Sequence, residues 1–483
     1  MSRMTRLPSG LRILLSVLML VEICLGANRD VMAADRLPTV LIGGVPHVRQ
    51  KPDFCGEACA EMWLRKRGVV GDQDYVFDQS GLDPTLGRGC YTKELAQALK
   101  RIGFRIGDIY TSIPVRTAEA SLDKAFAGMH SDLKRGVPSI VCMHFDDRPQ
   151  TTEHFRLVLG YDEKADEVVY HDPAVDDGAN LRMKRRQYLK LWPLKYAADT
   201  WTLVRLRLDA DQLQAATAAV NEYTDADFAQ HILGLRERLP HAGFSFVIQK
   251  PFVVVGDEPL NTVQRRADQT VKWAVDHLKR DYFAKDPTEI IDIWLFQDAN
   301  SYEEHVETLT KRKPTTPYGF YSSTDKALFM NISTGGGTLV HEIVHPFIAS
   351  NFPACPSWFN EGLASLYEQA GERDGHIIGH TNWRLKGLQT AIRKETVPSF
   401  ETLCGTTTRE FYDRDPGTNY SQARYLCYYL QEHDLLHKYY HSFRKNAATD
   451  PTGFGTLKAV LQEQDMAKFK QRWEAEVLKL EFR

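Results

Sequence analysis

Two histidines four residues apart, His341 and His345, are the side chains of this sequence best suited to chemistry. On a helix this spacing directs both imidazoles from one face, where they can hold a single metal ion. Glu342 follows the first histidine, and its carboxylate can take the proton of a water that the ion activates. Sixteen residues beyond His345, Glu361 offers a third protein ligand. Two imidazoles and one carboxylate suit zinc and leave its fourth position open, as catalysis requires.

The order of these residues resembles a known group of enzymes. HEIVH followed by WFNEGLA is similar to the gluzincins, the thermolysin-like clan of zinc metallopeptidases. The resemblance implies a zincin-like fold, a Zn²⁺ cofactor and a peptide or protein substrate. It also implies that His341, His345 and Glu361 bind zinc and that Glu342 is the general base.

Three neighbouring features bear on this zinc site. Residues 327–332 predict a strand, which is either the antiparallel edge strand that pairs with substrate in gluzincins or an ordinary strand of the core sheet. Farther on, Tyr420 lies in a segment resembling the helix that carries an oxyanion-stabilising tyrosine, although Tyr425 or a buried core role is an equal alternative. Pro346 departs from the family pattern, because a proline inside a helix removes a hydrogen bond and predicts a kink that re-aims His345.

A second group of reactive side chains lies near the start of the chain. Cys55 follows a Lys-Pro-Asp turn and precedes apolar residues at helical spacing, so its thiol is expected at a helix start, where the helix dipole favours thiolate. A cysteine nucleophile needs a base and a group that orients the base. His154 opens a predicted strand and Asp172 ends the next, so a hairpin can bring them together; His171 is the competing base. Gln50 can offer an amide to an oxyanion.

This second constellation also resembles a family. Gln-x4-Cys-Gly-x-Ala, a later His-Phe and then Asp-Pro-Ala follow the order found in the double-glycine leader peptidases, the papain-like peptidase family C-39 and its stand-alone relatives. The resemblance spans residues 37–207. It implies Cys55 as nucleophile, His154 as base, Asp172 as the orienting acid and Gln50 as the oxyanion donor.

The whole chain sets the architecture that must position these groups. Its 483 residues exceed one ordinary domain. The patterns predict an α+β protein with a papain-like domain at 37–207, a helical connector at 208–245 and a zincin-like domain at 246–483. A net charge of −3 gives no case for nucleic acid, and the absence of a Gly-x4-Gly-Lys-Ser/Thr loop argues against ATP.

The first residues predict export. Three arginines precede a short apolar run at 13–21, which is typical of a secretory signal peptide spanning residues 1–33, with cleavage after Ala33 or after Ala27. The alternative is an uncleaved anchor, the only case in which we expect membrane attachment. We therefore expect an extracytoplasmic protein.

Seven cysteines remain after such cleavage, and an odd count is consistent with one free thiol. If Cys55 is that thiol, the others can pair in an oxidising compartment, and Cys355 is a candidate partner for Cys404 or Cys427.

Two hypotheses follow. The first is an exported bacterial peptidase with a zinc site and a Cys-His-Asp site. The second is a secreted peptide-binding or envelope-sensing protein in which one or both folds are not catalytic. Glu57 and Pro346 favour the second, because a charge at Glu57 beside Cys55 raises the pKa of the thiol and Pro346 disturbs the zinc helix.

Overall fold

A computed structural model describes residues 37–149, 151–217, 223–239 and 243–482. The predicted signal peptide therefore lies outside the described residues. The described residues divide into two compact units: an N-terminal one up to residue 226, and a C-terminal one from 227 that also takes in residues 83–87 and Tyr223. Helices and strands are mixed in both, so the protein is α+β. Within the described ranges, no helix combines the length and the apolar character needed to cross a bilayer.

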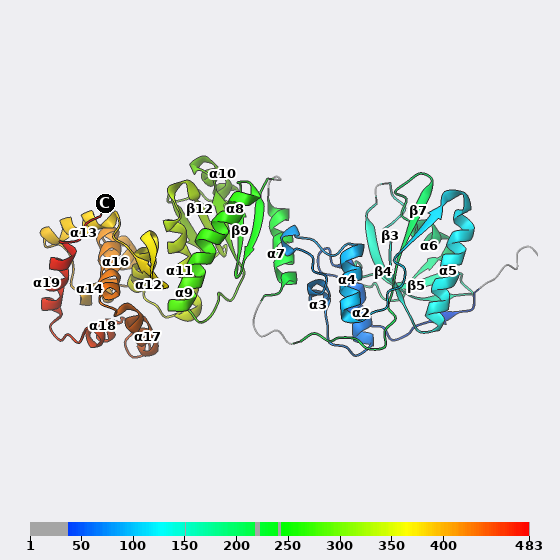
Figure 1. The fold of residues 1–483 in the computed structure, drawn as a ribbon, viewed down its shortest axis with the longest axis horizontal. Helices are drawn as coiled ribbons and strands as arrows, with labels where there is room; N and C mark the ends of the chain where they lie inside the picture. The colour runs from blue at the N-terminus through cyan, green and yellow to red at the C-terminus, as the bar shows by residue number, and fades with distance from the viewer. Residues whose placement is uncertain (1–36, 150, 218–222, 240–242, 483) are drawn as a thin grey trace, which may run out of the picture. The chain divides into compact units, whose positions relative to one another are not determined.

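The N-terminal unit is built on an antiparallel sheet (Figure 1). Its strands lie in the order β2-β7-β3-β4-β5-β6, and β1 also pairs with β4. Their bounds are β1 Val40–Leu41, β2 Tyr110–Pro114, β3 Ser139–His144, β4 Glu153–Asp162, β5 Glu167–His171, β6 Leu181–Lys184 and β7 Thr200–Arg207. The β4–β5 hairpin expected from the sequence is present. Its turn brings the end of β5 back beside the start of β4, where Leu157 pairs with His171.

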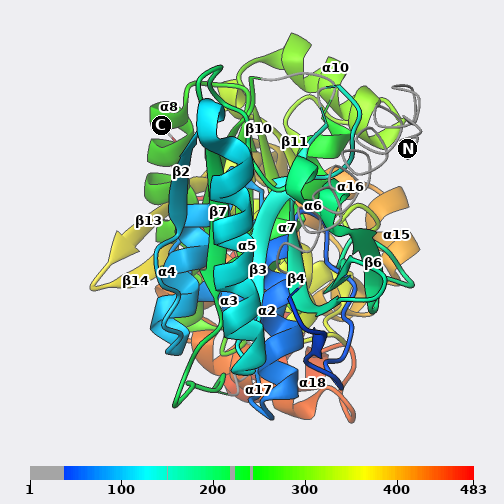
Figure 2. The ribbon, with the colours of Figure 1, turned by 90° about the vertical axis from the view of Figure 1, so that its right-hand side faces the viewer.

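Helices cover both faces of this sheet. Their bounds are α2 Cys55–Lys66, α3 Gln73–Asp78, α4 Thr92–Ile102, α5 Ala118–Lys134 and α6 Arg185–Leu191. Figure 2 shows α5 in front of strands β3 and β7, where Phe126 packs in one apolar cluster with Val141 and Val158. On the other side, the start of α2 approaches β4 and α4 so closely that a Cβ on Gly56 would lie 2.6 Å from the Leu95 side chain. A glycine after Cys55 therefore permits this packing.

The C-terminal unit has a five-stranded sheet in the order β11-β12-β10-β9-β8. The strands are β8 Ser245–Gln249, β9 Phe252–Gly256, β10 Ile291–Phe296, β11 Gly319–Ser322 and β12 Ala327–Asn331. Strand β12 runs parallel to β10 and antiparallel to β11. The alternative that made residues 327–332 the edge strand is thus wrong, because the shorter β11 folds back along the outer side of β12 and forms the edge itself.

Helices also flank this second sheet. Alternate residues of β9 point to opposite faces, so Val254 packs with the helices that carry the zinc motif and Val255 packs with α7 and α10. The long helix predicted over 262–283 is present in three successive segments, of which the middle one is π-helical. The helices and last strands are α7 Asp225–Arg238, α8 Leu260–Arg266, the π-segment Ala267–Lys272, α9 Trp273–Asp281, α10 Ala299–Thr310, α11 Gly337–Asn351, α12 Ser357–Leu366, β13 Ala370–Arg373, β14 His376–Gly379, α13 Arg384–Arg393, α14 Phe400–Cys404, α15 Thr408–Asp413, α16 Pro416–Glu432, α17 Leu436–Asn446, α18 Phe454–Leu461 and α19 Met466–Val477.

The connector differs from its prediction. Among the described residues of the connector only those of α7 are helical, whereas residues 210–217 form no helix. In this stretch Gln214 donates its backbone N–H to Ile102 O at 2.9 Å, and Ala216 donates to Val70 O at 2.8 Å. Backbone groups that are satisfied by the N-terminal unit have no need of helical partners, which is why the helical spacing here misleads.

The cysteines also differ from their expected pairing. All seven in the described part of the chain are free thiols, including Cys355, Cys404 and Cys427. Burial raises the pKa of each of these three, which keeps them protonated.

Candidate active sites

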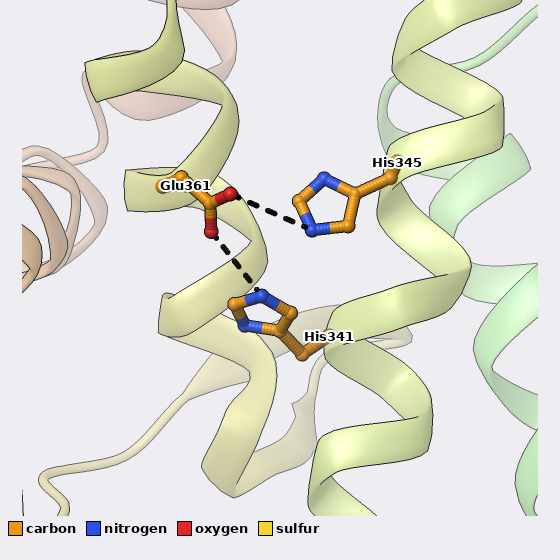
Figure 3. Close-up of side chains that lie close together, drawn as sticks. All are labelled: His341, His345 and Glu361. Carbon is orange, nitrogen blue, oxygen red and sulfur yellow. Dashed lines mark ion pairs between the residues drawn. The ribbon is translucent and has the colours of Figure 1, made fainter. Parts of the chain in front are cut away.

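The predicted zinc ligands lie together between two helices. His341 and His345 project one turn apart from α11, and Glu361 faces them from α12 (Figure 3). Glu361 Oε2 is 3.3 Å from His341 Nε2, and Glu361 Oε1 is 3.9 Å from His345 Nε2. One ligand atom from each residue can be chosen so that all three lie within 4.8 Å of one another. Three side chains in this arrangement could hold a metal ion, with the side of the ion facing away from them left open.

The far nitrogens of both histidines face polar side chains, but among the described residues only that of His345 has a hydrogen-bond partner. His345 Nδ1 is 3.0 Å from the side-chain oxygen of Asn360, and His341 Nδ1 is 3.4 Å from Glu368 Oε1. Such partners fix the tautomer and the orientation of metal-binding imidazoles. Sequence reasoning assigned no role to Asn360 or Glu368. Glu368 lies seven residues, two helical turns, after Glu361, so the spacing could have indicated it.

Glu368 is in turn fixed by a buried network. Arg384 donates to both of its oxygens, at 2.7 and 2.9 Å, and Asn382 donates at 2.8 Å. Burial opposes ionisation of Glu368, but the hydrogen bonds from Arg384 and the nearby His341 outweigh it and lower its pKa to about 2. A charged carboxylate therefore stands behind His341.

Glu342 lies on the same face of α11. Its Oε2 accepts a hydrogen bond from the Tyr321 backbone N–H of β11 at 3.0 Å and is 3.9 Å from His345 Nε2. Burial raises the pKa of Glu342, while the two neighbouring histidines oppose that rise. The carboxylate is thus held beside the three ligand atoms by the edge strand.

Two tyrosines face Glu361 from the helices beyond it. Tyr412, on α15, donates its hydroxyl to Glu361 Oε1 at 2.6 Å, and nothing in the sequence indicated it. Tyr420, on α16, stacks obliquely on Tyr412 with ring centroids 6.2 Å apart. Burial and then the charge of Glu361 raise the pKa of Tyr420, so its hydroxyl stays a donor. The alternative, Tyr425, is fully buried and its hydroxyl bonds the backbone of Asn382.

Pro346 does not break the helix. Helix α11 continues through it to Asn351, and Pro346 is buried within the helix. His345 still faces Glu361, so the expected re-aiming of this imidazole does not remove it from the cluster.

The donor set fits zinc. Glu361 Oε2 is buried and has no hydrogen-bond partner among the described residues, although it faces His341. Burial opposes ionisation of Glu361, but the nearby His341 and His345 lower its pKa to about 2. A buried carboxylate oxygen facing two imidazole nitrogens suits a divalent ion of borderline softness.

The cysteine site lies in the N-terminal unit. Cys55 is the first residue of α2, as the sequence predicts. A backbone hydrogen bond links its thiol to Phe155, the residue after His154 on β4. Cys59, one turn later, is buried and its thiol lies 3.7 Å from Phe155 O. The start of the helix therefore lies against the strand that carries the candidate base.

His154 and Asp172 form a close pair. His154 Nε2 is 2.7 Å from Asp172 Oδ1, and both side chains are buried. The competing His171 is held by the backbone instead: its Nδ1 accepts from Asn180 N–H, and its Nε2 lies 3.0 Å from Val45 O. The structure thus places His154 rather than His171 beside Asp172.

Asp172 has a second buried partner that sequence reasoning missed. Arg156 donates its Nε to Asp172 Oδ2 at 2.8 Å and is only 4% exposed. It lies two residues after His154 on β4, so both side chains leave the same face of the strand. Burial opposes ionisation of Asp172, but His154 and Arg156 together lower its pKa.

Gln50 reaches the same region. Its backbone N–H donates to Pro173 O at 3.0 Å, directly after Asp172. Its side-chain oxygen is buried without a hydrogen-bond partner among the described residues.

The thiol of Cys55 is poorly disposed to ionise at rest. Burial, followed by the charges of Glu57 and Asp53, raises its pKa to about 12, although the hydrogen bond with Phe155 opposes the rise. Glu57 itself is fully buried and accepts the Cys90 backbone N–H at 2.7 Å. Burial raises the pKa of Glu57 to about 7.

Comparison with known proteins identifies the first of these units. Residues 42–198 match the model of the Peptidase_C39 like family. Among solved structures, a protein from Bacillus anthracis described as a C39-like peptidase is 16% identical, covers 35% of this chain and 98% of its own, and has a TM-score of 0.25. The peptidase domain of Streptococcus ComA, a bi-functional ABC transporter involved in a quorum sensing pathway, is 17% identical, covers 33% and 98%, and has a TM-score of 0.22. No curated protein compared with the chain matches it.

The family match confirms the resemblance found for the first half of the sequence and ends at residue 198, so the resemblance of the second half to gluzincins stays a prediction. The N-terminal half of the chain therefore contains a region, residues 42–198, that is similar to the Peptidase_C39 like family.

Proposed function

We propose that this protein is an exported peptidase whose leading catalytic centre is a zinc site formed by His341, His345 and Glu361. The convergence of these three side chains, with ligand atoms within 4.8 Å of one another, is the observation that carries the proposal. The outer nitrogen of His345, held by Asn360, and the carboxylate of Glu368 facing His341 at 3.4 Å support it, because surface histidines at this spacing have no need of such neighbours.

A bound zinc ion would polarise the scissile carbonyl and lower the pKa of the attacking water. Glu342 would accept the proton of that water and pass it to the leaving amine, as a general base and then a general acid. Its fixed carboxylate, held by the Tyr321 N–H, is in place for this role.

Two further groups would act on the substrate. The hydroxyl of Tyr420 would donate a hydrogen bond to the oxyanion of the tetrahedral intermediate, since that of Tyr412 is already donated to Glu361. Because the Tyr321 N–H donates to Glu342, the free edge of strand β11 faces the candidate zinc site. An extended peptide would add along that edge by main-chain hydrogen bonds.

The test pairs metal content with hydrolysis. We expect about one zinc per chain held by the 341–361 cluster. Glu342→Gln should keep this zinc and lower kcat on a peptide library by about 10²- to 10⁴-fold. Glu304→Gln, an exposed glutamate on α10, is the matched control and should change neither. Protein without zinc at this cluster, or Glu342→Gln with full peptide hydrolysis, would overturn the assignment.

A second catalytic centre is supported by the C39-like match and by the 2.7 Å pair of His154 and Asp172. Here Cys55 would attack the carbonyl while His154 takes the thiol proton and later gives it to the leaving amine, and Gln50 would donate to the oxyanion. Cys55→Ala should remove whatever hydrolysis survives in Glu342→Gln. If Cys55→Ala, Glu342→Gln and the double variant all hydrolyse peptides as fast as the wild type, neither centre catalyses the reaction.

The raised pKa of Cys55 favours a rival reading, in which this unit only binds extended peptides. Alkylation separates the two readings. The binding role is supported if Cys55 reacts with iodoacetamide near neutral pH no faster than the other six thiols. It also requires that the Cys55→Ala variant binds peptide normally.

Export is part of the proposal and depends on residues 1–33. Fractionation of the producing cell, with mass spectrometry of the mature N-terminus, tests it. A protein that begins at Met1 and stays in the cytoplasm would refute export without affecting the zinc site.

A further inference from the structure

A second group of histidines and a carboxylate lies elsewhere in the C-terminal unit. Asp281 ends α9, His376 begins β14 and His437 lies in the first turn of α17. His376 Nδ1 is 2.7 Å from Asp281 Oδ1, and His437 Nε2 is 3.9 Å from Asp281 Oδ2. Both histidines line a cavity of about 250 Å³, to which Asp434 also contributes.

The carboxylate of Asp281 lacks a permanent positive partner. Its side chain is 0% exposed, and its only ion-pair partners within the described residues are these two histidines. Its remaining contact is the Ile377 backbone N–H, at 2.8 Å from Oδ2. Buried carboxylates are usually paired with a fixed cation or coordinate a metal ion, and Asp281 faces two imidazoles instead. A bound cation would supply a fixed positive charge.

The spacing is looser than that of the zinc ligands described above, because the ligand atoms of Asp281, His376 and His437 do not all lie within 4.8 Å of one another in the described residues. Glu361 lies 3.3 and 3.9 Å from the nitrogens of its two histidines, and Asp281 lies 2.7 and 3.9 Å from its own. The imidazole centroids of His376 and His437 are 5.7 Å apart, against 5.0 Å for the first pair. Both rings are about half exposed, so they are free to close the remaining gap by small side-chain rotations.

The chemistry of the donors narrows the ion. Imidazole nitrogens prefer zinc, nickel or copper to calcium or magnesium. Burial lowers the pKa of His437, which keeps its nitrogen lone pair available at neutral pH. Asp434 or a water would complete four ligands.

We propose that Asp281, His376 and His437 form a second binding site for a divalent transition-metal ion such as Zn²⁺. The ion would replace the proton between His376 and Asp281 and draw His437 onto the same carboxylate. It would thereby tie α9, the β13–β14 hairpin and α17, which are far apart in the sequence, and act as a structural cross-link.

The test uses the full chain with the first site removed, so that the two metal proposals fail separately. In a His341→Ala/His345→Ala variant, we expect one equivalent of Zn²⁺ by calorimetry and a zinc-dependent rise in the midpoint of thermal unfolding. Adding His437→Gln should weaken this binding at least tenfold. Adding His433→Gln should not, because His433 pairs with Glu476 and does not line the cavity.

The wild-type protein gives a second readout if the double variant does not fold. There the proposal expects two equivalents of bound zinc and the loss of one equivalent in His437→Gln. Zinc stoichiometry and zinc-dependent stabilisation that are the same with and without His437 would overturn the proposal in either background.

Discussion

Replacing Glu57 by Gln should stabilise the N-terminal unit above neutral pH. Glu57 is 0% exposed, and burial raises its pKa to about 7 from an ordinary value of 4.5. A pKa difference of about 2.5 corresponds to about 3 kcal/mol between the two protonation states. The free energy of unfolding is lowered by this amount when Glu57 ionises in the folded state.

The direction with pH follows from proton binding. Between about pH 4.5 and 7 the folded chain keeps the proton on Glu57 while the unfolded chain releases it, so the unfolded state binds fewer protons. The stability of the wild type therefore falls as pH rises through this window and stays lower above it. Glutamine resembles the protonated acid, so Glu57→Gln should match the wild type below about pH 4.5 and exceed it by about 3 kcal/mol above pH 7.

Hydrogen exchange of the α2 amides in the full chain, measured from pH 5 to 8, reports the opening free energy of this unit. The control is Glu61→Gln, because Glu61 is buried one turn later but pairs with Arg65 at 2.5 Å. Glu61→Gln should therefore not stabilise the N-terminal unit at pH 8. A Glu57→Gln variant that is no more stable than the wild type at pH 8 would refute the reasoning. The same substitution should also speed alkylation of Cys55, because it removes a charge that raises the thiol pKa.

Three other outcomes are expected. Asp172→Asn leaves Arg156 buried without a counter-ion and should destabilise the N-terminal unit by about 3 to 5 kcal/mol, as hydrogen exchange would measure. Because the pKa of Asp172 is lowered in the folded state, its contribution to the stability of the wild type should persist above about pH 4 and fade as the pH falls further. Tyr412→Phe removes the hydrogen bond to Glu361 and should weaken zinc binding about 10-fold or more by competition with a chelator, whereas unchanged affinity would deny Tyr412 that role. Chelation of the metal should abolish the Glu342-dependent hydrolysis and leave the Cys55-dependent part intact, as a peptide-release assay would measure.

Local sequence signals predicted the elements that carry the reactive side chains. The helix at Cys55, the hairpin between His154 and Asp172, and the helix with His341 and His345 all lie where the periodicity placed them. Each depends on a turn, a cap or an apolar period that lies within a short stretch of chain.

The contacts that depend on tertiary packing could not be predicted in this way. Tyr412 reaches Glu361 from a helix 51 residues later, and no spacing rule links them. The bond from Arg156 to Asp172 needs the actual register of β4 and β5. The edge position of β11 depends on which strand pairs outermost, and a single strand pattern carries no such information.

The two candidate centres differ in how their charges are arranged, and this sets the chemistry each can perform. Burial, followed by the charges of Glu57 and Asp53, raises the pKa of the Cys55 thiol and so favours its protonated form at rest. The carboxylate of Asp172 is divided between His154 and Arg156, so it offers an imidazolium less support than an unshared one would. Cys55 would therefore attack only as His154 removes its proton, with no thiolate formed beforehand. At the candidate zinc cluster His345 is hydrogen-bonded to Asn360, His341 faces Glu368 and Glu342 is held by backbone, so less reorganisation is needed there once an ion is bound. The metal centre is for this reason the stronger candidate for the main hydrolytic activity.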